Sequence, residues 1–210
     1  MKWGRKLAGT EKSASRPGRL VVLVSGAGTN MQAIAEACAT GALAATVSAV
    51  IADRPTAGAL QKATDAGITT LVIERGPGEE RPAYDRRLAD VVDQFQPDFV
   101  VLAGWMKLLS MNFLKRFPNR VVNLHPALPG QFPGTHSIER ALQAAQRLGL
   151  NRTGVMVHFV ADEGVDNGPI IATVEVPIHP ADSLESLTER VHEAEHVLLV
   201  EALATVLATR

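Results

Sequence analysis

Short apolar runs alternate with longer amphipathic stretches along most of this chain. Runs rich in β-branched residues predict buried strands, and stretches with apolar residues every three to four positions predict helices. The predicted strands cover residues 20–24, 46–51, 69–72, 99–103, 121–124, 155–160 and 170–176. The predicted helices cover residues 30–39, 58–66, 82–94, 112–117, 137–148 and 184–207. Such alternation is typical of a parallel sheet covered by helices.

The order of these elements predicts an α/β fold in a single domain. We expect a doubly wound, mostly parallel sheet with helices on both faces, a Rossmann-like N-terminal half and a more irregular C-terminal part. With 210 residues, 46% of them hydrophobic, the chain can bury one sizeable core. The domain is expected to span residues 19–210, and a surface loop is expected over residues 144–152.

Composition restricts the compartment. The longest apolar runs, such as residues 99–106, fall far below the roughly 18 residues that suggest a membrane span. Residues 1–18 contain no apolar block like the core of a signal peptide. Cys38 is the only cysteine, which excludes an intramolecular disulfide and suits a reducing compartment. We therefore expect a soluble, cytoplasmic protein with no membrane partner.

The net charge of −1 conceals an uneven distribution. Residues 1–19 carry six Lys or Arg and one Glu, so the remainder of the chain carries a net charge of −6. A domain of that sign is poorly suited to binding a phosphate backbone. Nucleic acid is therefore not an expected partner, and residues 1–18 are predicted to form a disordered basic tail.

A polar pair closes the strand predicted over residues 121–124. Because side chains alternate along a strand, Asn123 and His125 point to the same side while Leu124 points away. An amide and a protonated imidazole can both donate hydrogen bonds to the oxyanion that develops in acyl transfer. A purely structural histidine at a strand end is the alternative. Further on, Asp166 is explained equally well as a site carboxylate or as part of a turn with residues 167–169.

The first strand leads through a glycine turn, residues 25–30, into the first helix. Glycines let the backbone approach an anion, and the free amides at a helix start point towards it, so the turn predicts a phosphate site. The structural alternative is a tight turn at Gly26 and Gly28 with Thr29 or Asn30 capping the helix. No Gly-Lys-Ser/Thr ending follows, so the turn is not a P-loop.

A dinucleotide site is a weaker interpretation of the same region. Asp53, at the end of the second strand, resembles the acid that binds ribose in Rossmann domains. The third glycine of that fingerprint would fall at Met31, whose bulk would obstruct the close contact between helix and strand. An oxidoreductase is therefore the less favoured function.

Two other histidines carry weaker signals. His136 could cap the helix predicted to begin at residue 137, and His158 lies in a strand-like run; either could line a site without taking part in chemistry. No His and carboxylate spacing matches a metal site, so no metal is expected.

Four motifs in this order resemble phosphoribosylglycinamide formyltransferase over residues 19–207. They are residues 25–30, 103–109, 123–126 and 162–169. The resemblance implies the formyltransferase fold and transfer of the formyl group of 10-formyltetrahydrofolate to the amine of glycinamide ribonucleotide, in purine biosynthesis. It implies these two substrates as small-molecule partners, a reduced folate as cosubstrate, and it allows a homodimer, since members often form dimers.

The resemblance also implies roles for individual residues. Catalysis falls to Asn123, His125 and Asp166, which favours the site interpretation of Asp166. Nucleotide binding falls to Gly28, Thr29, Asn30 and Glu195. Folate binding falls to Arg81, Met106, Lys107, Leu108, Leu109, Asn123, Val160, Ala161, Asp162, Glu163, Gly164, Val165 and Asp166. Where the family more usually has Ser-Leu-Leu-Pro, this chain has Ala127-Leu128-Pro129-Gly130, which leaves the path of that loop open.

The expected mechanism is direct attack of the amine on the formyl carbon through a tetrahedral intermediate, with protonated His125 and Asn123 as donors. Other formyl-transfer functions are less favoured. A methionyl-tRNA formyltransferase would ordinarily need a further C-terminal domain and a basic surface, and a formyltetrahydrofolate hydrolase usually carries an extra N-terminal domain. A non-catalytic folate- or nucleotide-binding module is the alternative from a different class.

Overall fold

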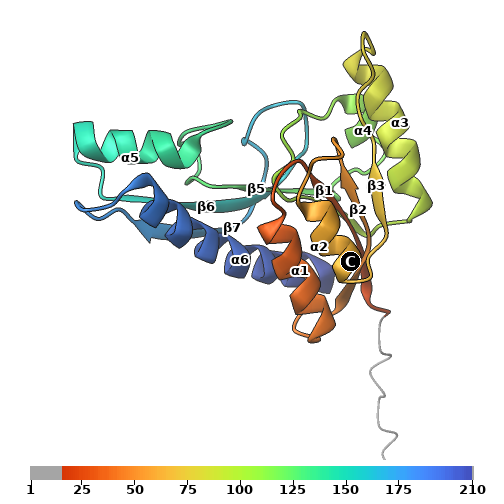
Figure 1. Cartoon of the computed structure of the whole chain (residues 1–210), viewed down its shortest axis with the longest axis horizontal. Coiled ribbons are helices and arrows are strands. Elements are labelled where there is room, and N and C mark those ends of the chain that lie inside the picture. The colour runs from red at the N-terminus through yellow and green to blue at the C-terminus, as the bar shows by residue number, and fades with distance from the viewer. Residues whose placement is uncertain (1–15, 210) are drawn as a thin grey trace, which may run out of the picture.

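The computed structural model describes residues 16–209 and is organised around one seven-stranded sheet (Figure 1). The strand order is β3-β2-β1-β4-β5-β6-β7. The strands are β1 (Gly18–Val24), β2 (Ala45–Ala52), β3 (Thr70–Val72), β4 (Phe99–Leu102), β5 (Val121–His125), β6 (Arg152–Phe159) and β7 (Ile170–Pro177). Strands β1 to β5 pair in parallel, whereas β6 runs antiparallel to β5 and β7 antiparallel to β6. The predicted mostly parallel sheet is confirmed.

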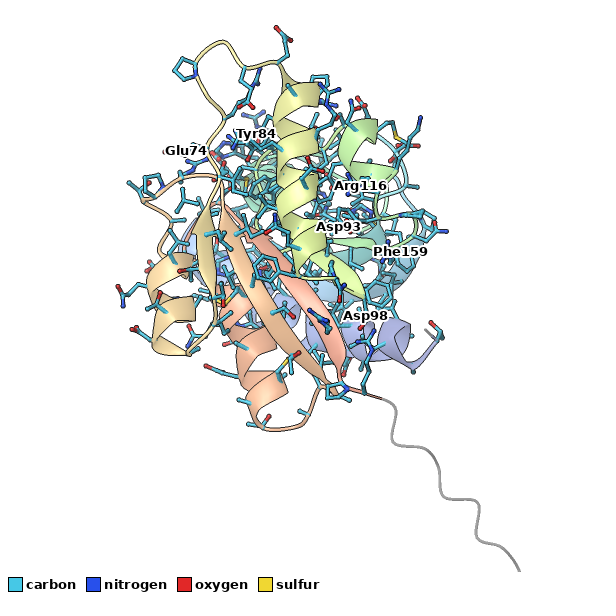
Figure 2. All side chains as sticks on the ribbon, turned by 90° about the vertical axis from the view of Figure 1, so that its right-hand side faces the viewer. Glu74, Tyr84, Asp93, Asp98, Arg116 and Phe159 are labelled. Atoms are coloured by element: carbon cyan, nitrogen blue, oxygen red, sulfur yellow. The ribbon has the colours of Figure 1, made fainter. Side chains whose placement is uncertain are left out.

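Helices cover both faces of this sheet, as predicted. They are α1 (Thr29–Ala39), α2 (Ala59–Asp65), α3 (Arg81–Gln94), α4 (Met111–Leu114), α5 (Ser137–Leu148) and α6 (Leu184–Ala208). Alternation in β1 produces two cores: Val22 packs in the core with α1, α2, α5 and α6, whereas Val21 packs in the core with α3 and α4. Figure 2 shows the molecule from the side of α3. Asp93 of α3 accepts a 2.9 Å hydrogen bond from Arg116, which follows α4 in the sequence.

Two sequence expectations are corrected by the chain path. Gly18 already belongs to β1, and Arg16 forms a 2.8 Å ion pair with Asp98, so the basic tail does not extend to residue 18. The rest of the predicted tail lies outside the described residues. Residues 144–148 continue α5, which ends where Gly149 takes a positive φ of 71°, so only residues 149–151 connect α5 to β6.

The parallel strands β1, β4 and β5 end on the same edge of the sheet. Their ends are joined by backbone hydrogen bonds, such as the one from the Ser25 N–H to the Gly104 carbonyl at 3.1 Å. This edge is where ligand sites form in open α/β sheets. None of the helices in residues 16–209 combines the length and the apolar character that crossing a membrane requires.

Candidate active site

A cavity of about 670 Å³ opens at this edge of the sheet. Its walls come from the turn before α1, the segment after β4, the end of β5, the loop 160–168 and part of α6. Predicted site residues that line it are Gly28, Thr29, Asn30, Met106, Lys107, Leu108, Leu109, Asn123, His125, Val160, Asp162, Glu163, Gly164, Val165, Asp166 and Glu195. Arg81 and Ala161 are not among the lining residues. One cavity therefore joins both predicted substrate regions.

The three residues predicted to be catalytic meet through the carboxylate of Asp166. The amide Nδ2 of Asn123 donates to Oδ1 at 3.1 Å, and Nδ1 of His125 lies 3.2 Å from Oδ2. The backbone N–H of Gly134 also donates to Oδ2, at 2.8 Å. Asp166 has a positive φ of 52°, so it is a turn residue as well as a member of the cluster. Both interpretations of Asp166 therefore agree with its geometry.

Burial and hydrogen bonding shift the pKa values of this cluster downwards. Desolvation lowers the pKa of His125 below 6.5, although the charge of Asp166 opposes that shift. The pKa of Asp166 is lowered despite burial, because hydrogen bonds such as the one from the Gly134 N–H favour its carboxylate. Burial thus favours the neutral His125 ring in the absence of a ligand. Its Nε2 atom is buried and has no hydrogen-bond partner.

His158, which the sequence allowed to line a site, lies in the cavity wall and contacts the cluster. Its Nδ1 atom lies 2.9 Å from the Phe159 carbonyl, which can only accept, so Nδ1 carries the proton. The other ring nitrogen, Nε2, accepts from the Asn123 amide at 3.1 Å. Antiparallel pairing of β5 with β6 sets Asn123 opposite His158, and this pairing was not part of the sequence prediction. Both amide hydrogens of Asn123 are therefore engaged, one by His158 and one by Asp166.

The turn before α1 supports an anion site with unobstructed backbone donors. Gly28 occupies the position before the first helical residue with φ +77°, and no side chain caps the helix. The predicted alternative of a Thr29 or Asn30 cap is therefore wrong. A Cβ atom at position 28 would lie 2.4 Å from the Cβ of Ala59, so only glycine fits between α1 and α2.

Glu195 of α6 reaches the same turn. Its Oε2 atom accepts a 2.8 Å hydrogen bond from Nδ2 of Asn30, although the two residues lie far apart in the sequence. Burial raises the pKa of Glu195, while the Asn30 hydrogen bond favours the carboxylate. A carboxylate beside an anion turn can accept hydrogen bonds from sugar hydroxyls. His192, one turn earlier on α6, also lines the cavity and had not been identified from the sequence.

The structure gives no support to the dinucleotide interpretation. Met31 is fully buried in the hydrophobic core beside α6. The buried carboxylate of Asp53 is 3.0 Å from the ammonium of Lys107 and accepts two hydrogen bonds from Arg54. Its hydrogen-bonding capacity is therefore used within the protein rather than offered to a ribose.

The segment after β4 offers apolar surface to the cavity. Met106 and Leu108 are 63% and 49% exposed, which is unusual for large apolar side chains. Leu109, by contrast, is only 4% exposed and packs into the core with α3. Val165 on the opposite loop is also exposed. A flat, partly apolar ring system would fit between these side chains.

Arg81 lies at the rim and is tied to the loop 160–168. Its guanidinium forms an ion pair with Glu163, and the second carboxylate oxygen of Glu163 accepts the Met111 N–H at 2.9 Å.

The exposed His136 occupies the position before α5 with φ +58°. Its side chain does not cap the helix, and its Nδ1 atom lies 3.4 Å from Glu139. The capping role suggested for His136 is therefore wrong.

The family described as "Formyl transferase" matches residues 18–203, most of the chain. The chain belongs to the formyl transferase family. Among its relatives, the phosphoribosylglycinamide formyltransferase of Schizosaccharomyces pombe is 45% identical over 196 residues, which make up 88% of this chain and 94% of the relative. The Escherichia coli K12 enzyme of that name is 41% identical over 179 residues, 85% of this chain and 82% of the relative.

Solved structures agree with this family membership. Glycinamide ribonucleotide transformylase 1 from Symbiobacterium toebii superimposes with a TM-score of 0.84 at 39% identity, covering 90% of this chain and 87% of that one. The protein is therefore a formyl-transferring enzyme of purine biosynthesis. Membership of the formyl transferase family implies a folate-type formyl donor.

The loop 127–130, whose sequence in this formyl transferase differs from the more usual family motif, has a defined path. Ala127 is fully buried, and its N–H donates to the His125 carbonyl at 2.9 Å. Leu128 packs so closely on β6 that a Cβ at Gly154 would lie 2.4 Å from its Cδ2. Gly130 takes φ +74° at the following turn. The loop is thus anchored on both sides directly after the catalytic candidate His125.

The described residues 16–209 give no indication of metal or thiol chemistry. Residues 16–209 contain no group of three or more His, Cys, Asp or Glu side chains that could hold a metal ion. Cys38 is not among the residues that line the cavity, and burial raises the pKa of its thiol to about 11. A thiol of that pKa is protonated at neutral pH and is a poor nucleophile.

Proposed function

We propose that the protein transfers the formyl group of 10-formyltetrahydrofolate to the amine of glycinamide ribonucleotide, giving formylglycinamide ribonucleotide and tetrahydrofolate. The observation that carries this proposal is the position of the cluster formed by Asn123, His125 and Asp166. It lines a single cavity together with an anion turn and with an exposed apolar segment. Each substrate therefore has a matching surface, and the reacting atoms meet at the cluster.

The turn at residues 28–30 binds the nucleotide phosphate in this proposal. Its free backbone amides and the start of α1 supply hydrogen bonds and a positive dipole. Glu195, positioned by Asn30, accepts hydrogen bonds from the ribose. The nucleotide is thereby fixed at the end that does not react.

The exposed side chains of Met106 and Leu108 enclose the pterin ring of the donor, while the loop 160–166 and the backbone of 106–109 supply polar contacts. Arg81 at the rim attracts the carboxylates of the folate tail. Leu109 contributes through its backbone, because its side chain belongs to the core. These surfaces hold the formyl group near Asn123.

The reaction proceeds by direct attack of the amine on the formyl carbon. A new C–N bond forms and the carbonyl electrons move to the oxygen, which becomes an oxyanion. Asn123 donates one amide hydrogen to this oxygen in exchange for its bond to Asp166, while His158 in strand β6 keeps the amide oriented. The developing negative charge favours uptake by His125 of a proton from solvent, because burial alone favours its neutral form; His125 then donates to the oxyanion and returns this proton to solvent when the intermediate collapses.

Collapse of the intermediate breaks the bond between the carbon and N10 of the folate. The proton lost by the attacking amine passes to N10, through a water oriented by Asp166. The lowered pKa of Asp166 keeps it ionised, so that it stabilises the positive charge on His125. No covalent enzyme intermediate is required.

The organisation of the chain follows from the same proposal. We infer one formyltransferase domain that begins with β1 at Gly18 instead of residue 19, preceded by the basic N-terminal segment, and a cytoplasmic location. The acidic charge of the domain disfavours nucleic acid as a partner.

A tetrahydrofolate-release assay with and without glycinamide ribonucleotide tests the proposal. Turnover is expected only when the nucleotide is present, and mass spectrometry should detect one formyl group on the nucleotide. Equal release without nucleotide would identify a hydrolase instead. Tight binding of the donor without release in either case would identify a binding module.

A further inference from the structure

Outside the reacting cluster, one buried carboxylate connects two walls of the cavity. Asp53 follows β2, and its side chain is fully buried. Its oxygens lie 3.0 Å from the Arg54 Nε and 3.0 Å from the Lys107 ammonium. These two cations are the side-chain partners that the geometry gives to the carboxylate. A buried charge is retained at such a position when several donors satisfy it.

Ser25 holds the backbone of the neighbouring residue in the apolar segment. Its Oγ atom accepts the Met106 N–H at 3.0 Å. Two consecutive residues are thus held by different partners: Met106 by Ser25, and Lys107 by Asp53. Ser25 also directly precedes the anion turn at residues 26–30.

The attachment decides which way this segment faces. With the Met106 amide held by Ser25 and the Lys107 ammonium held by Asp53, the side chains of Met106 and Leu108 remain exposed at the cavity. Without the carboxylate, the Lys107 ammonium would lose its partner and would be free to turn into the space between these side chains. A free cation there would disfavour an apolar ring.

We propose that Asp53 is a positioning residue that shapes the folate end of the cavity by holding Lys107, next to Met106, in place. This inference rests on the proposed function, because it concerns how the donor is bound. Asp53 does not line the cavity, so it acts through its partners and not by contact with a substrate.

The test compares Asp53→Asn with a matched control, Arg54→Met. An asparagine has one acceptor oxygen and an amino group, so it cannot satisfy both cations. The KM for 10-formyltetrahydrofolate should rise about tenfold, while kcat and the KM for the nucleotide change less than about twofold. Arg54→Met removes the other cation from the same carboxylate without touching residues 106–107, and should leave both KM values within about twofold.

A second pair of variants separates positioning from folding. If the unpaired ammonium causes the defect, adding Lys107→Met to Asp53→Asn should restore at least half of the lost affinity for the donor. An unchanged donor KM in Asp53→Asn would overturn the proposal. So would an equal rise of both KM values, or a lower melting temperature as the only effect, because each indicates a purely structural role.

Direct binding distinguishes this inference from the proposed function. Trp105 lies in the segment concerned, and the chain has one other tryptophan, Trp3. In a Trp3→Phe background, Trp105 fluorescence reports binding of 5-formyltetrahydrofolate, a stable isomer of the donor. Weaker binding by Asp53→Asn supports the inference even if no formyl transfer is detected. Equal binding by both proteins overturns it even if the wild-type enzyme transfers the formyl group.

Discussion

The two ends of the cavity are built in different ways. At the nucleotide end, the site consists of regular elements: Gly28 directly precedes α1, packs against Ala59 of α2, and Asn30 bonds to Glu195 within α6. At the folate end, the walls are the irregular segment 104–109 and the loop 160–168. Helices packed into the core hold the first end, whereas polar side-chain contacts hold the second.

This difference indicates which part of the site can rearrange. Contacts within the core are lost only on unfolding, but an ion pair at a rim can exchange its partner for a ligand. Asp166 and Glu163, both in the loop 160–168, already occupy donors that a substrate needs: those of Asn123 and Arg81. We therefore expect the nucleotide end to be preformed and the folate end to be completed by its ligand.

The largest effect is expected where the two ends meet. Asn123→Ala removes an oxyanion donor, and such a loss typically costs about 10² to 10³ in kcat. The KM values for both substrates should change much less, because the bond forms mainly in the transition state. Steady-state kinetics with both substrates measures this. Retained wild-type turnover would exclude the assigned role of Asn123.

Gly28→Ala tests the packed end through stability. The new Cβ would meet Ala59 at a left-handed backbone position, so the variant should lose about 2 to 5 kcal/mol of unfolding free energy. Gly41→Ala is the matched control: its φ is +76°, but nothing lies within 4 Å of an added Cβ. It should lose only about 1 to 2 kcal/mol. Equal losses in urea unfolding would show that the contact with Ala59 is unimportant.

The reacting cluster should contribute a pH-dependent part of the stability. Burial lowers the folded-state pKa of His125, so the unfolded chain binds its proton more readily and stability falls as the pH drops below 6.5. His125→Gln should lose less stability over this range. His196, whose pKa is also lowered by burial, remains in both proteins and cancels in the comparison. Melting curves with the same pH dependence in both proteins would refute this.

Sequence patterns predicted the packed end better than the loop end. The β-branched run 20–24 and the glycine turn after it are local signals, and the structure places them as predicted. Partners of the irregular segments are distant in sequence: Lys107 meets Asp53, and Glu163 meets Arg81. Spacing within one segment contains no information about such pairs.

The contact of His158 with Asn123 could not be predicted for a similar reason. Its strand was predicted from the apolar run 155–160, but alternation does not say which strand pairs with which. Only the antiparallel pairing with β5 brings His158 to Asn123. Leu109, which the family resemblance assigns to folate binding, lines the cavity, although its side chain is buried against α3. The resemblance does not distinguish a side-chain contact from a backbone contact at this position.

The smallest effect is expected at the rim, from Glu163→Gln. The amide oxygen can still accept the Met111 N–H, but the charge of Glu163 is lost, which leaves Asp85, 3.9 Å away, as the carboxylate beside Arg81. If Arg81 must exchange Glu163 for a carboxylate of the donor, the KM for 10-formyltetrahydrofolate should fall about two- to fivefold, the range expected for an exposed ion pair.

Glu79→Gln provides the control for that change. Glu79 forms an ion pair with Arg87, with 2.8 Å between the carboxylate oxygen and the guanidinium nitrogen. Neither residue lines the cavity. Its donor KM should therefore equal that of the wild type, and added salt should reduce the difference between Glu163→Gln and the wild type, since screening weakens exposed ion pairs. An increase of the donor KM in Glu163→Gln would instead mean that Glu163 orders the loop for binding, and the folate end would then be preformed like the nucleotide end.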